Sequence, residues 1–441
     1  MEKTPLEEWI LNKIGCKDSH NIRKQIDEYQ LKRIKENIDY VKENSIFYRE
    51  HLKGISSQEI NSLSDFKKVP FTDAGDIKNN PMHFLCVSQQ YIERVVSLNT
   101  SGTSSTPKRI YFTKEDQELT IDFFEKGMGG IVKRGDRVLI LLSGETSGSV
   151  GDLLKRGLDR LRVESYMYGY VTDFHETCRI IKDKNINCIV GVPIQVLNLK
   201  RKYNNIFNKF IRKILLSTDY VPEVVIKELS LPDCKVFTHY GMTEMGLGGG
   251  VECEALNGYH MREADLYFEI VNTENQETVK DGEYGEIVFT TLTRKGMPLI
   301  RYRTGDMGRF IDKPCICGTV LKTMDRVCGR IENGVTLSGG GYLSMRDLDE
   351  ILLKWEQISN FKAEIYTNDG KRDIIVIKIQ ITKNDFENIK NQINKDLYKI
   401  PALGDCLKNG QAELILQVYE DNMSTGSGIL KRKINDYRKK G

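Results

Sequence analysis

The sequence predicts an α/β protein, with a large N-terminal domain of helix-covered sheets and a small α+β domain at the C-terminus. Three features of the 441-residue chain favour this class. Residues 1–90 are rich in Lys, Glu, Ile and Asn, with apolar residues at helical spacing. From Tyr91 onward, short apolar runs alternate with helical segments, as in a parallel sheet covered by helices. Residues 330–441 have the size of a separate small domain. We therefore divide the chain into residues 1–90, 91–329 and 330–441.

Each element is predicted from its own residue pattern. Helical periodicity predicts a helix over 22–48 and another from Lys114, which follows strands at 91–99 and 110–112. Short apolar runs bounded by turn signals predict buried strands at 137–142, 188–192, 214–217 and 235–238. Antiparallel strands are expected at 265–272 and 285–292. A domain boundary near 325–333 is followed by a glycine run at 339–341, helices at 344–355 and 384–398, and strands at 373–381 and 412–419.

Composition and charge exclude several classes of protein. Charged residues make up 29% of the chain and hydrophobic residues 39%, as in an ordinary globular protein, and the net charge of +3 gives no argument for a nucleic-acid partner. No apolar run reaches membrane-spanning length, and the N-terminus lacks a secretory pattern. The ten dispersed cysteines favour reduced thiols or a metal site over a disulfide framework. We expect a cytoplasmic protein with no membrane partner.

A loop of small hydroxyl residues and glycine occupies residues 100–108 (TSGTSSTPK). Small residues let backbone N–H groups approach a phosphate closely, and Lys108 adds a positive charge. The loop lies between two predicted strands, so it is not a Walker P-loop, which opens a helix. By itself the loop fits either a phosphate site or an exposed linker.

Two further motifs also combine glycine with hydroxyl residues and end in a carboxylate: Tyr240-Gly241-Met242-Thr243-Glu244 and Tyr302-Arg303-Thr304-Gly305-Asp306. A glutamate is a hard oxygen ligand suited to Mg²⁺, and an aspartate accepts hydrogen bonds from vicinal hydroxyls. Taken singly, Tyr240 could be a core aromatic and Asp306 a turn residue. The three motifs in this order, before a lysine-rich C-terminus, indicate an enzyme that activates an acid with ATP.

Three cysteines and a histidine provide a complete tetrahedral zinc set: Cys253, His260, Cys315 and Cys317. Four protein ligands leave no open coordination position, so we interpret this site as structural. The alternative is four unrelated buried residues, because free cysteine is commonly found in protein cores.

Together these motifs resemble the adenylate-forming superfamily of acyl-CoA ligases, nonribosomal adenylation domains and luciferases, and most of all its phenylacetate–CoA ligase branch. The resemblance extends from residues 66–72 (FKKVPFT) to Lys431. It implies the adenylate-forming enzyme fold, with a mobile C-terminal domain that rotates about a hinge at residues 330–333. The branch often has a similar Cys/His arrangement, which supports the zinc site.

The resemblance also implies site residues. ATP phosphates are expected on Ser101, Gly102, Thr103, Ser104 and Lys108. Thr243 is expected to hold the α-phosphate and Glu244 the Mg²⁺, while Asp306 and Arg330 reach the ribose. His239, Tyr240 and Gly241 complete the nucleotide-binding set.

Two departures from the family pattern accompany these assignments. The family loop usually has Thr-Gly where this chain has Ser104-Ser105. The family's catalytic lysine normally follows a glycine, whereas here the stretch reads GSGILKRK. We assign the role to Lys431, with Lys433 as the second choice and a solvated basic tail as the alternative reading.

The implied activity is an ATP-dependent ligase that forms an acyl-adenylate and pyrophosphate, then a thioester with CoA. The glycine run at 339–341 would give backbone access to the pantetheine arm. Expected walls of the acid pocket are Tyr166, Val192, Pro193, Thr218, Tyr240, Met245 and Gly246, which favour an aromatic or arylalkyl acid. One alternative passes the acyl group to a carrier-protein thiol or an amine. Another is a non-catalytic, zinc-stabilised nucleotide-binding protein. Relatives in this branch are often dimers, so a homodimer is expected.

Overall fold

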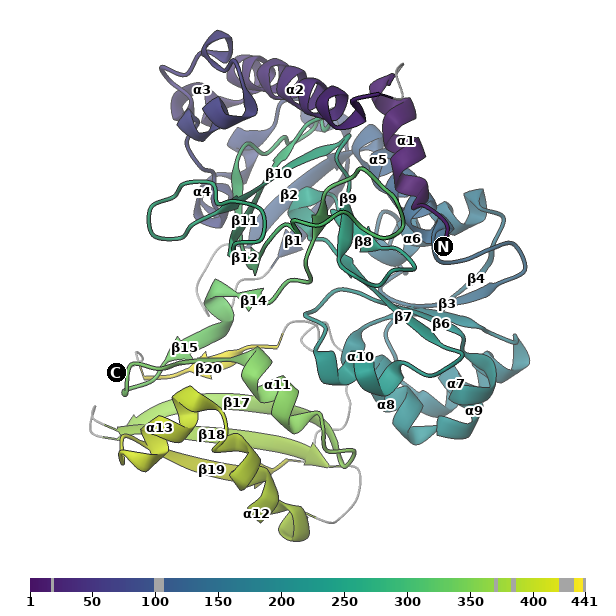
Figure 1. Cartoon of the computed structure of the whole chain (residues 1–441), viewed down its shortest axis with the longest axis vertical. Helices are drawn as coiled ribbons and strands as arrows, with labels where there is room; N and C mark the ends of the chain where they lie inside the picture. Colours follow the sequence, from purple (N-terminus) through teal and green to yellow (C-terminus); the bar gives the residue numbers. More distant parts are fainter. Residues whose placement is uncertain (17–19, 99–106, 369–371, 382–385, 420–431, 439–441) are drawn as a thin grey trace. The chain divides into compact units, whose positions relative to one another are not determined.

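The computed structural model describes residues 1–16, 20–98, 107–368, 372–381, 386–419 and 432–438. The chain forms two compact units (Figure 1). Unit 1 comprises Met1–Gly169 and Phe237–Val327, and unit 2 comprises Tyr170–Val236 and Cys328–Gly441. Within the described residues, no helix has both the length and the apolar character needed to cross a membrane. The sequence-based division into residues 1–90, 91–329 and 330–441 stays a prediction.

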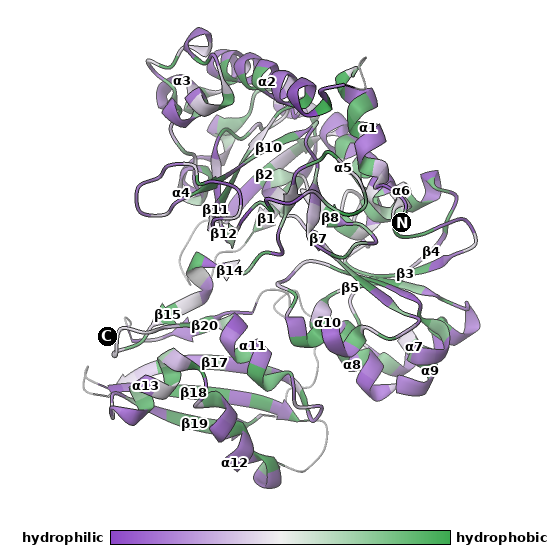
Figure 2. Ribbon diagram, viewed as in Figure 1, coloured by the Kyte–Doolittle hydropathy of each residue, from purple (hydrophilic) through white to green (hydrophobic). Residues whose placement is uncertain are grey.

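The N-terminal part of unit 1 is helical. Its α-helices are α1 (Pro5–Ile14), α2 (Ile22–Asn44), α3 (Ile46–His51) and α4 (Ala74–Asn79). Figure 2 shows apolar and polar residues alternating along α2, whose buried side includes Ile26, Ile34 and Ile38. The helical segment expected over 22–48 is confirmed apart from a break at Ser45, which adopts an extended conformation and whose side chain accepts a hydrogen bond from Tyr48 N. Ser45 therefore ends one helix and caps the next.

Short 3₁₀ turns connect these helices to the first strands of unit 1. They are η1 (Ser57–Glu59), η2 (Leu63–Lys68), η3 (Pro81–Phe84) and η4 (Gln89–Tyr91). The strands β1 (Ile92–Leu98) and β2 (Lys108–Thr113) then pair antiparallel. Helix α5 (Lys114–Gly129) begins with a capping box between Thr113 and Asp116. The predicted strands at both ends of the 100–108 loop are confirmed.

Unit 1 contains three further groups of strands. β3 (Arg137–Leu141) and β4 (Glu164–Met167) pair parallel, with α6 (Val150–Arg160) between them in sequence. β7 (Lys235–Tyr240), which belongs to unit 1 from Phe237 onward, forms an antiparallel ladder with β8 (Gly250–Glu252), β9 (Tyr259–Met261) and β13 (Thr323–Met324). β10 (Leu266–Val271), β11 (Gly285–Thr291) and β12 (Tyr302–Gly308) form an antiparallel meander. One apolar core joins the N-terminal helices to β2 and this meander.

Unit 2 begins with a parallel strand pair. β5 (Cys188–Gly191) follows α7 (Phe174–Asp183) and pairs with β6 (Lys213–Leu216). The connection contains α8 (Pro193–Lys202) and α9 (Asn204–Phe210), and α10 (Glu223–Leu229) follows β6. Helix α8 begins with proline at its first position, where no N–H is needed.

The C-terminal part of unit 2 is a four-stranded sheet in the order β19-β18-β17-β20. These strands are β17 (Ile358–Asn368), β18 (Arg372–Ile381), β19 (Ala412–Val418) and β20 (Ile434–Asp436). Figure 1 shows α12 (Phe386–Leu397) and α13 (Pro401–Lys408) in front of this sheet. Ahead of it lie β14 (Gly329–Arg330), η6 (Ile331–Asn333), the hairpin β15 (Gly334–Thr336) and β16 (Tyr342–Ser344), and α11 (Met345–Leu352).

A fully buried arginine fixes the start of β12. Arg301 has a positive φ of 45° and forms a bidentate ion pair with Glu269 (3.0 and 3.1 Å). Its third guanidinium nitrogen, Nη1, donates to the carbonyl oxygens of Lys67 (3.0 Å) and Val69 (2.6 Å), and its guanidinium lies 4.0 Å from the ring centroid of Phe71. The 66–72 segment is thereby attached to β12.

Replacing Arg301 with methionine is expected to destabilise unit 1 by about 3–5 kcal/mol, since the buried Glu269 carboxylate loses its partner. Burial raises the pKa of Glu269, and Arg301 lowers that pKa. Without Arg301 only the effect of burial remains, so the Glu269 carboxylate of the variant should bind a proton on folding. Urea unfolding would measure the change. The control is Arg309→Met, which removes a half-exposed ion pair with Asp325 and should change stability much less. Equal losses in both variants would contradict the prediction.

Candidate functional site

Side chains from three separate segments meet at the start of β2. Lys108 forms an ion pair with Glu244, and its ammonium also donates to the hydroxyl of Tyr302 (3.1 Å). The Tyr302 hydroxyl lies 3.5 Å from the same Glu244 oxygen. The Lys108 and Glu244 side chains are only 11% and 3% exposed. A lysine, a carboxylate and a phenol are thus held in one largely dehydrated cluster, where electrostatic interactions are strong.

The second half of this site joins β7 to β12. The Tyr240 hydroxyl donates to Asp306 Oδ2 (3.1 Å), and both residues are buried. The Tyr240 ring stacks on Tyr259, with 6.0 Å between ring centroids. The Thr304 hydroxyl accepts a hydrogen bond from the backbone N–H of Asp306 (3.0 Å), which fixes the turn that carries the carboxylate.

The turn after β7 needs glycine. A Cβ on Gly241 would lie 2.3 Å from the carbonyl oxygen of Leu247, and Gly246 has a φ of 79°. Between them, Thr243–Met245 forms a single 3₁₀ turn, η5. The Thr120 hydroxyl of α5 donates to the carbonyl oxygen of Gly246 (2.8 Å) and so ties the turn to the helix. This geometry places Glu244 inward, toward Lys108.

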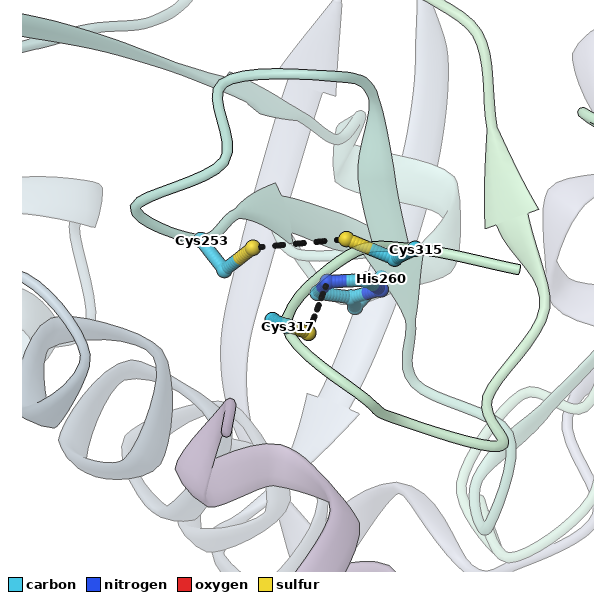
Figure 3. Close-up of side chains that lie close together, drawn as sticks. All are labelled: Cys253, His260, Cys315 and Cys317. Carbon is cyan, nitrogen blue, oxygen red and sulfur yellow. Dashed lines mark hydrogen bonds between the residues drawn. The ribbon is translucent and has the colours of Figure 1, made fainter. Parts of the chain in front are cut away.

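A second cluster brings together four metal-ligand side chains (Figure 3). The ligand atoms of Cys253, His260, Cys315 and Cys317 all lie within 4.8 Å of one another, and all four residues are buried. The Cys253 and Cys315 sulfurs are 3.8 Å apart, and Cys317 Sγ lies 3.5 Å from His260 Nε2. Sulfurs bound tetrahedrally to one zinc at about 2.3 Å lie about 3.8 Å apart. The distances therefore fit a shared ion.

The surroundings of the four side chains also suit a cation. The Thr323 hydroxyl lies 3.3 Å from His260 Nδ1, which leaves Nε2 directed at the thiols. The Ala255 N–H donates to Cys253 Sγ (3.4 Å). Burial raises the pKa of Cys253 and lowers the pKa of His260 to about 4. A bound divalent cation would offset the cost of burying thiolates here.

Comparisons with known proteins identify relatives of the chain. No family model matches it. Phenylacetate-coenzyme A ligase of Escherichia coli (strain K12) is 26% identical over 377 residues, covering 82% of this chain and 83% of that protein. The enzyme of the same name from Thermus thermophilus is 24% identical over 389 residues, covering 85% of each chain. The chain is therefore similar to phenylacetate–CoA ligases over most of its length.

Solved structures of acyl-CoA ligases have the same fold as this chain. The structure of 2-hydroxyisobutyryl-CoA ligase in the postadenylation state, in complex with 2-HIB-AMP, has a TM-score of 0.78 and 19% identity. The match covers 95% of this chain and 91% of that one. The predicted fold class, an α/β adenylate-forming enzyme fold, is confirmed.

The structure brings together only some of the residues assigned by resemblance to adenylate-forming enzymes. In unit 1, Lys108 pairs with Glu244 and Tyr240 pairs with Asp306, and the turn after β7 carries Gly241 and Thr243. Ser101, Gly102, Thr103, Ser104 and Lys431 lie outside the described residues. Arg330 lies on β14 in unit 2 and Lys433 lies just before β20.

The expected acid-pocket residues divide between the units. Met245 and Gly246 belong to the η5 turn of unit 1, and Tyr166 on β4 donates its hydroxyl to Glu164. Val192 and Pro193 start α8 in unit 2, and Thr218 follows β6 with a φ of 78°. The sequence interpretation assigned no role to the Tyr302 hydroxyl, although that residue opens the third motif. Arg294 is buried and donates a hydrogen bond to the carbonyl oxygen of Glu244 (2.7 Å), a contact that no local sequence pattern signals.

Proposed function

We propose that this chain is an ATP-dependent carboxylic acid–CoA ligase of the AMP-forming type. One observation carries the proposal: Lys108, Glu244 and Tyr302, from three distant motifs, converge within hydrogen-bonding distance. The relatives named phenylacetate-coenzyme A ligase, at 24–26% identity over most of the chain, support the same activity. The expected homodimer and cytoplasmic location stay predictions.

In the proposed first step, a carboxylate oxygen of the acid attacks the α-phosphorus of ATP. The bond to the bridging oxygen breaks, and pyrophosphate leaves with that electron pair. The protein positions the reactants and offsets the charge that develops, as in other phosphoryl transfers. In the second step the CoA sulfur attacks the acyl carbon, and AMP leaves as the thioester forms.

The described residues have distinct proposed roles in the first step. Lys108 offsets phosphate charge, and Thr243 donates its hydroxyl to the α-phosphate. The Glu244 carboxylate already forms an ion pair with the ammonium of Lys108, so a positive charge is accommodated beside it. Glu244 would hold Mg²⁺, which supplies charge neutralisation on the phosphates when it is bound. Asp306, oriented by Tyr240, would accept hydrogen bonds from the ribose hydroxyls.

A direct test is a panel of carboxylic acids in an assay for acid-dependent pyrophosphate exchange, with and without CoA. The proposal expects exchange without CoA, and AMP release with thioester formation when CoA is added. Exchange without any thioester would favour the carrier-protein or amine acceptor. Absence of exchange with every acid, despite ATP binding, would contradict ligase activity and favour the non-catalytic alternative.

We further propose an aromatic or arylalkyl acid as substrate. The support comes from rings beside the η5 turn in unit 1. The Phe123 and Phe124 rings of α5 lie 6.0 and 6.1 Å from the imidazole of His239 on β7. Burial lowers the pKa of His239 to about 4, so the ring is neutral near pH 7 and suits an uncharged aromatic group.

Within the acid panel, phenylacetate or benzoate is expected to exceed acetate in kcat/KM by about a hundredfold or more. The reason is that burying an aromatic ring contributes as much binding free energy as burying several methylene groups. The measurement is initial-rate exchange at varied acid concentration. A short aliphatic acid as the best substrate would contradict the aromatic assignment and leave the ligase proposal intact.

Finally, we propose that Cys253, His260, Cys315 and Cys317 hold a structural Zn²⁺. The support is the tetrahedral spacing of the donor atoms and their burial. All four coordination positions would be filled by protein, which leaves none for a reacting group.

A further inference from the structure

Arg294 is a buried cation close to the nucleotide site. It lies within residues 293–296 of the connection between β11 and β12. The Asp116 carboxylate of α5 accepts hydrogen bonds from the backbone N–H groups of Lys295 (3.0 Å) and Gly296 (3.1 Å). With the loop held in this way, Arg294 is only 5% exposed as a residue, whereas Lys295 is exposed.

The guanidinium of Arg294 bridges the two elements that carry the Lys108–Glu244 pair. One nitrogen donates to the carbonyl oxygen of Glu244 itself (2.7 Å). The other donates to the carbonyl oxygen of Tyr111 (2.8 Å), three residues after Lys108 on β2. The guanidinium carbon lies 4.4 Å from the ring centroid of Phe112. Arg294 therefore sets the distance between β2 and the η5 turn.

The charge of Arg294 is not neutralised by a direct partner. Its Nη atoms contact carbonyl oxygens, and in the described part of the chain its buried Nε has no hydrogen-bond partner. Burial lowers the pKa of Arg294, while the more distant charges of Asp116 and Glu244 raise it. A buried cation without an anionic partner is costly, and a bound anion would offset that cost.

We propose that Arg294 is a positioning residue of the nucleotide site and that the ATP triphosphate offsets its charge. Its planar fork holds the Glu244 turn against the strand of Lys108, and its charge favours a polyanion beside them. This inference rests on the proposed function, which places ATP and Mg²⁺ at Glu244. It needs no direct contact between Arg294 and the nucleotide.

The test compares equilibrium binding of Mg·ATP with that of adenosine, which lacks phosphates. Arg294→Gln keeps amide donors and removes the charge, and Mg·ATP affinity is expected to fall about 10- to 100-fold, as for loss of one buried charge interaction. Adenosine affinity should stay within about twofold. Arg294→Lys, which keeps the charge but loses the fork, should give an intermediate loss. Lys295→Met is the matched control, because the Lys295 ammonium is exposed and lies 4.4 Å from the ring centroid of Tyr40. This variant should bind both ligands like the wild type.

The outcomes separate this inference from the proposed function. Equal weakening of Mg·ATP and adenosine would mean a purely structural role and would overturn the inference, as would unchanged Mg·ATP affinity. If Arg294→Gln does not fold, the same comparison on Arg294→Lys decides. A wild type that binds Mg·ATP but catalyses no exchange with any acid would defeat the ligase proposal, while the binding comparison would still decide the role of Arg294.

Discussion

Cys315→Ser is expected to reduce the zinc content of the purified protein from about one ion per chain to near zero and to lower its unfolding free energy by at least about 3 kcal/mol. The thiolate lost is one of four buried ligands, and the remaining three would hold a cation far more weakly. Metal analysis and urea unfolding would measure the two effects. Chelation of the wild-type protein should reproduce the loss of stability.

The matched control is Cys234→Ser, which changes a buried free cysteine outside the cluster. This variant should lose some stability and keep its zinc. Wild-type protein without stoichiometric metal, or Cys315→Ser with unchanged metal content, would contradict a zinc site. The four residues would then be an ordinary buried group.

The proposed zinc cluster lies on segments that also carry residues of the proposed nucleotide site. Cys253 and His260 lie at the ends of the β8–β9 connection, and β8 pairs with the end of β7 that carries Tyr240. Cys315 and Cys317 lie in the chain after β12, which carries Asp306. An ion held by both segments would secure β12 and the β7–β9 ladder together. Loss of zinc is therefore expected to weaken the Tyr240–Asp306 hydrogen bond and nucleotide affinity with it.

The sequence contained enough information for the parts of this structure that depend on local patterns. Uninterrupted apolar runs identified β3 and β5, because strands of this kind are buried on both faces. The motifs that contain Lys108 and Glu244 were expected to contribute to one site, and the two side chains do form an ion pair. The nucleotide-binding roles of Lys108, Glu244 and Asp306 stay predictions. The β17 strand was missed, although its alternating Phe361, Ala363 and Ile365 are buried and would have revealed it.

Other features could not have been predicted because they depend on tertiary contacts. Nothing in the sequence distinguishes Arg294 and Arg301 from the other arginines of the chain, most of which are at least partly exposed. Their burial follows from carbonyl oxygens and carboxylates that arrive from distant segments, such as Glu269 for Arg301 and Tyr111 for Arg294. The break between α2 and α3 likewise depends on a single capping hydroxyl, that of Ser45, within an otherwise helical pattern.

Glu244→Gln is expected to lower the rate of acid-dependent pyrophosphate exchange by about 10²- to 10³-fold, the usual effect of removing one charged group that stabilises a transition state. Glutamine keeps the size of the side chain and can still bond Lys108 and Tyr302, but it lacks the negative charge that Mg²⁺ requires. The measurement is exchange at varied Mg²⁺ concentration. The variant should need more Mg²⁺ for half-maximal rate, which a general loss of packing would not produce.

Stability must be separated from catalysis in this experiment, because Glu244→Gln also leaves the Lys108 ammonium largely buried without its partner. The change in the free energy of unfolding measures the cost of leaving Lys108 unpaired, and adenosine binding reports whether the site keeps its shape. Glu118→Gln on α5 is the control, since its carboxylate pairs with Arg156 and Arg160 at the surface and should affect neither exchange nor Mg²⁺ dependence. If Glu244→Gln kept the wild-type exchange rate and Mg²⁺ dependence, another carboxylate would have to hold the metal. The convergence of Lys108, Glu244 and Tyr302 would then be a structural ion-pair cluster beside the nucleotide rather than part of its site.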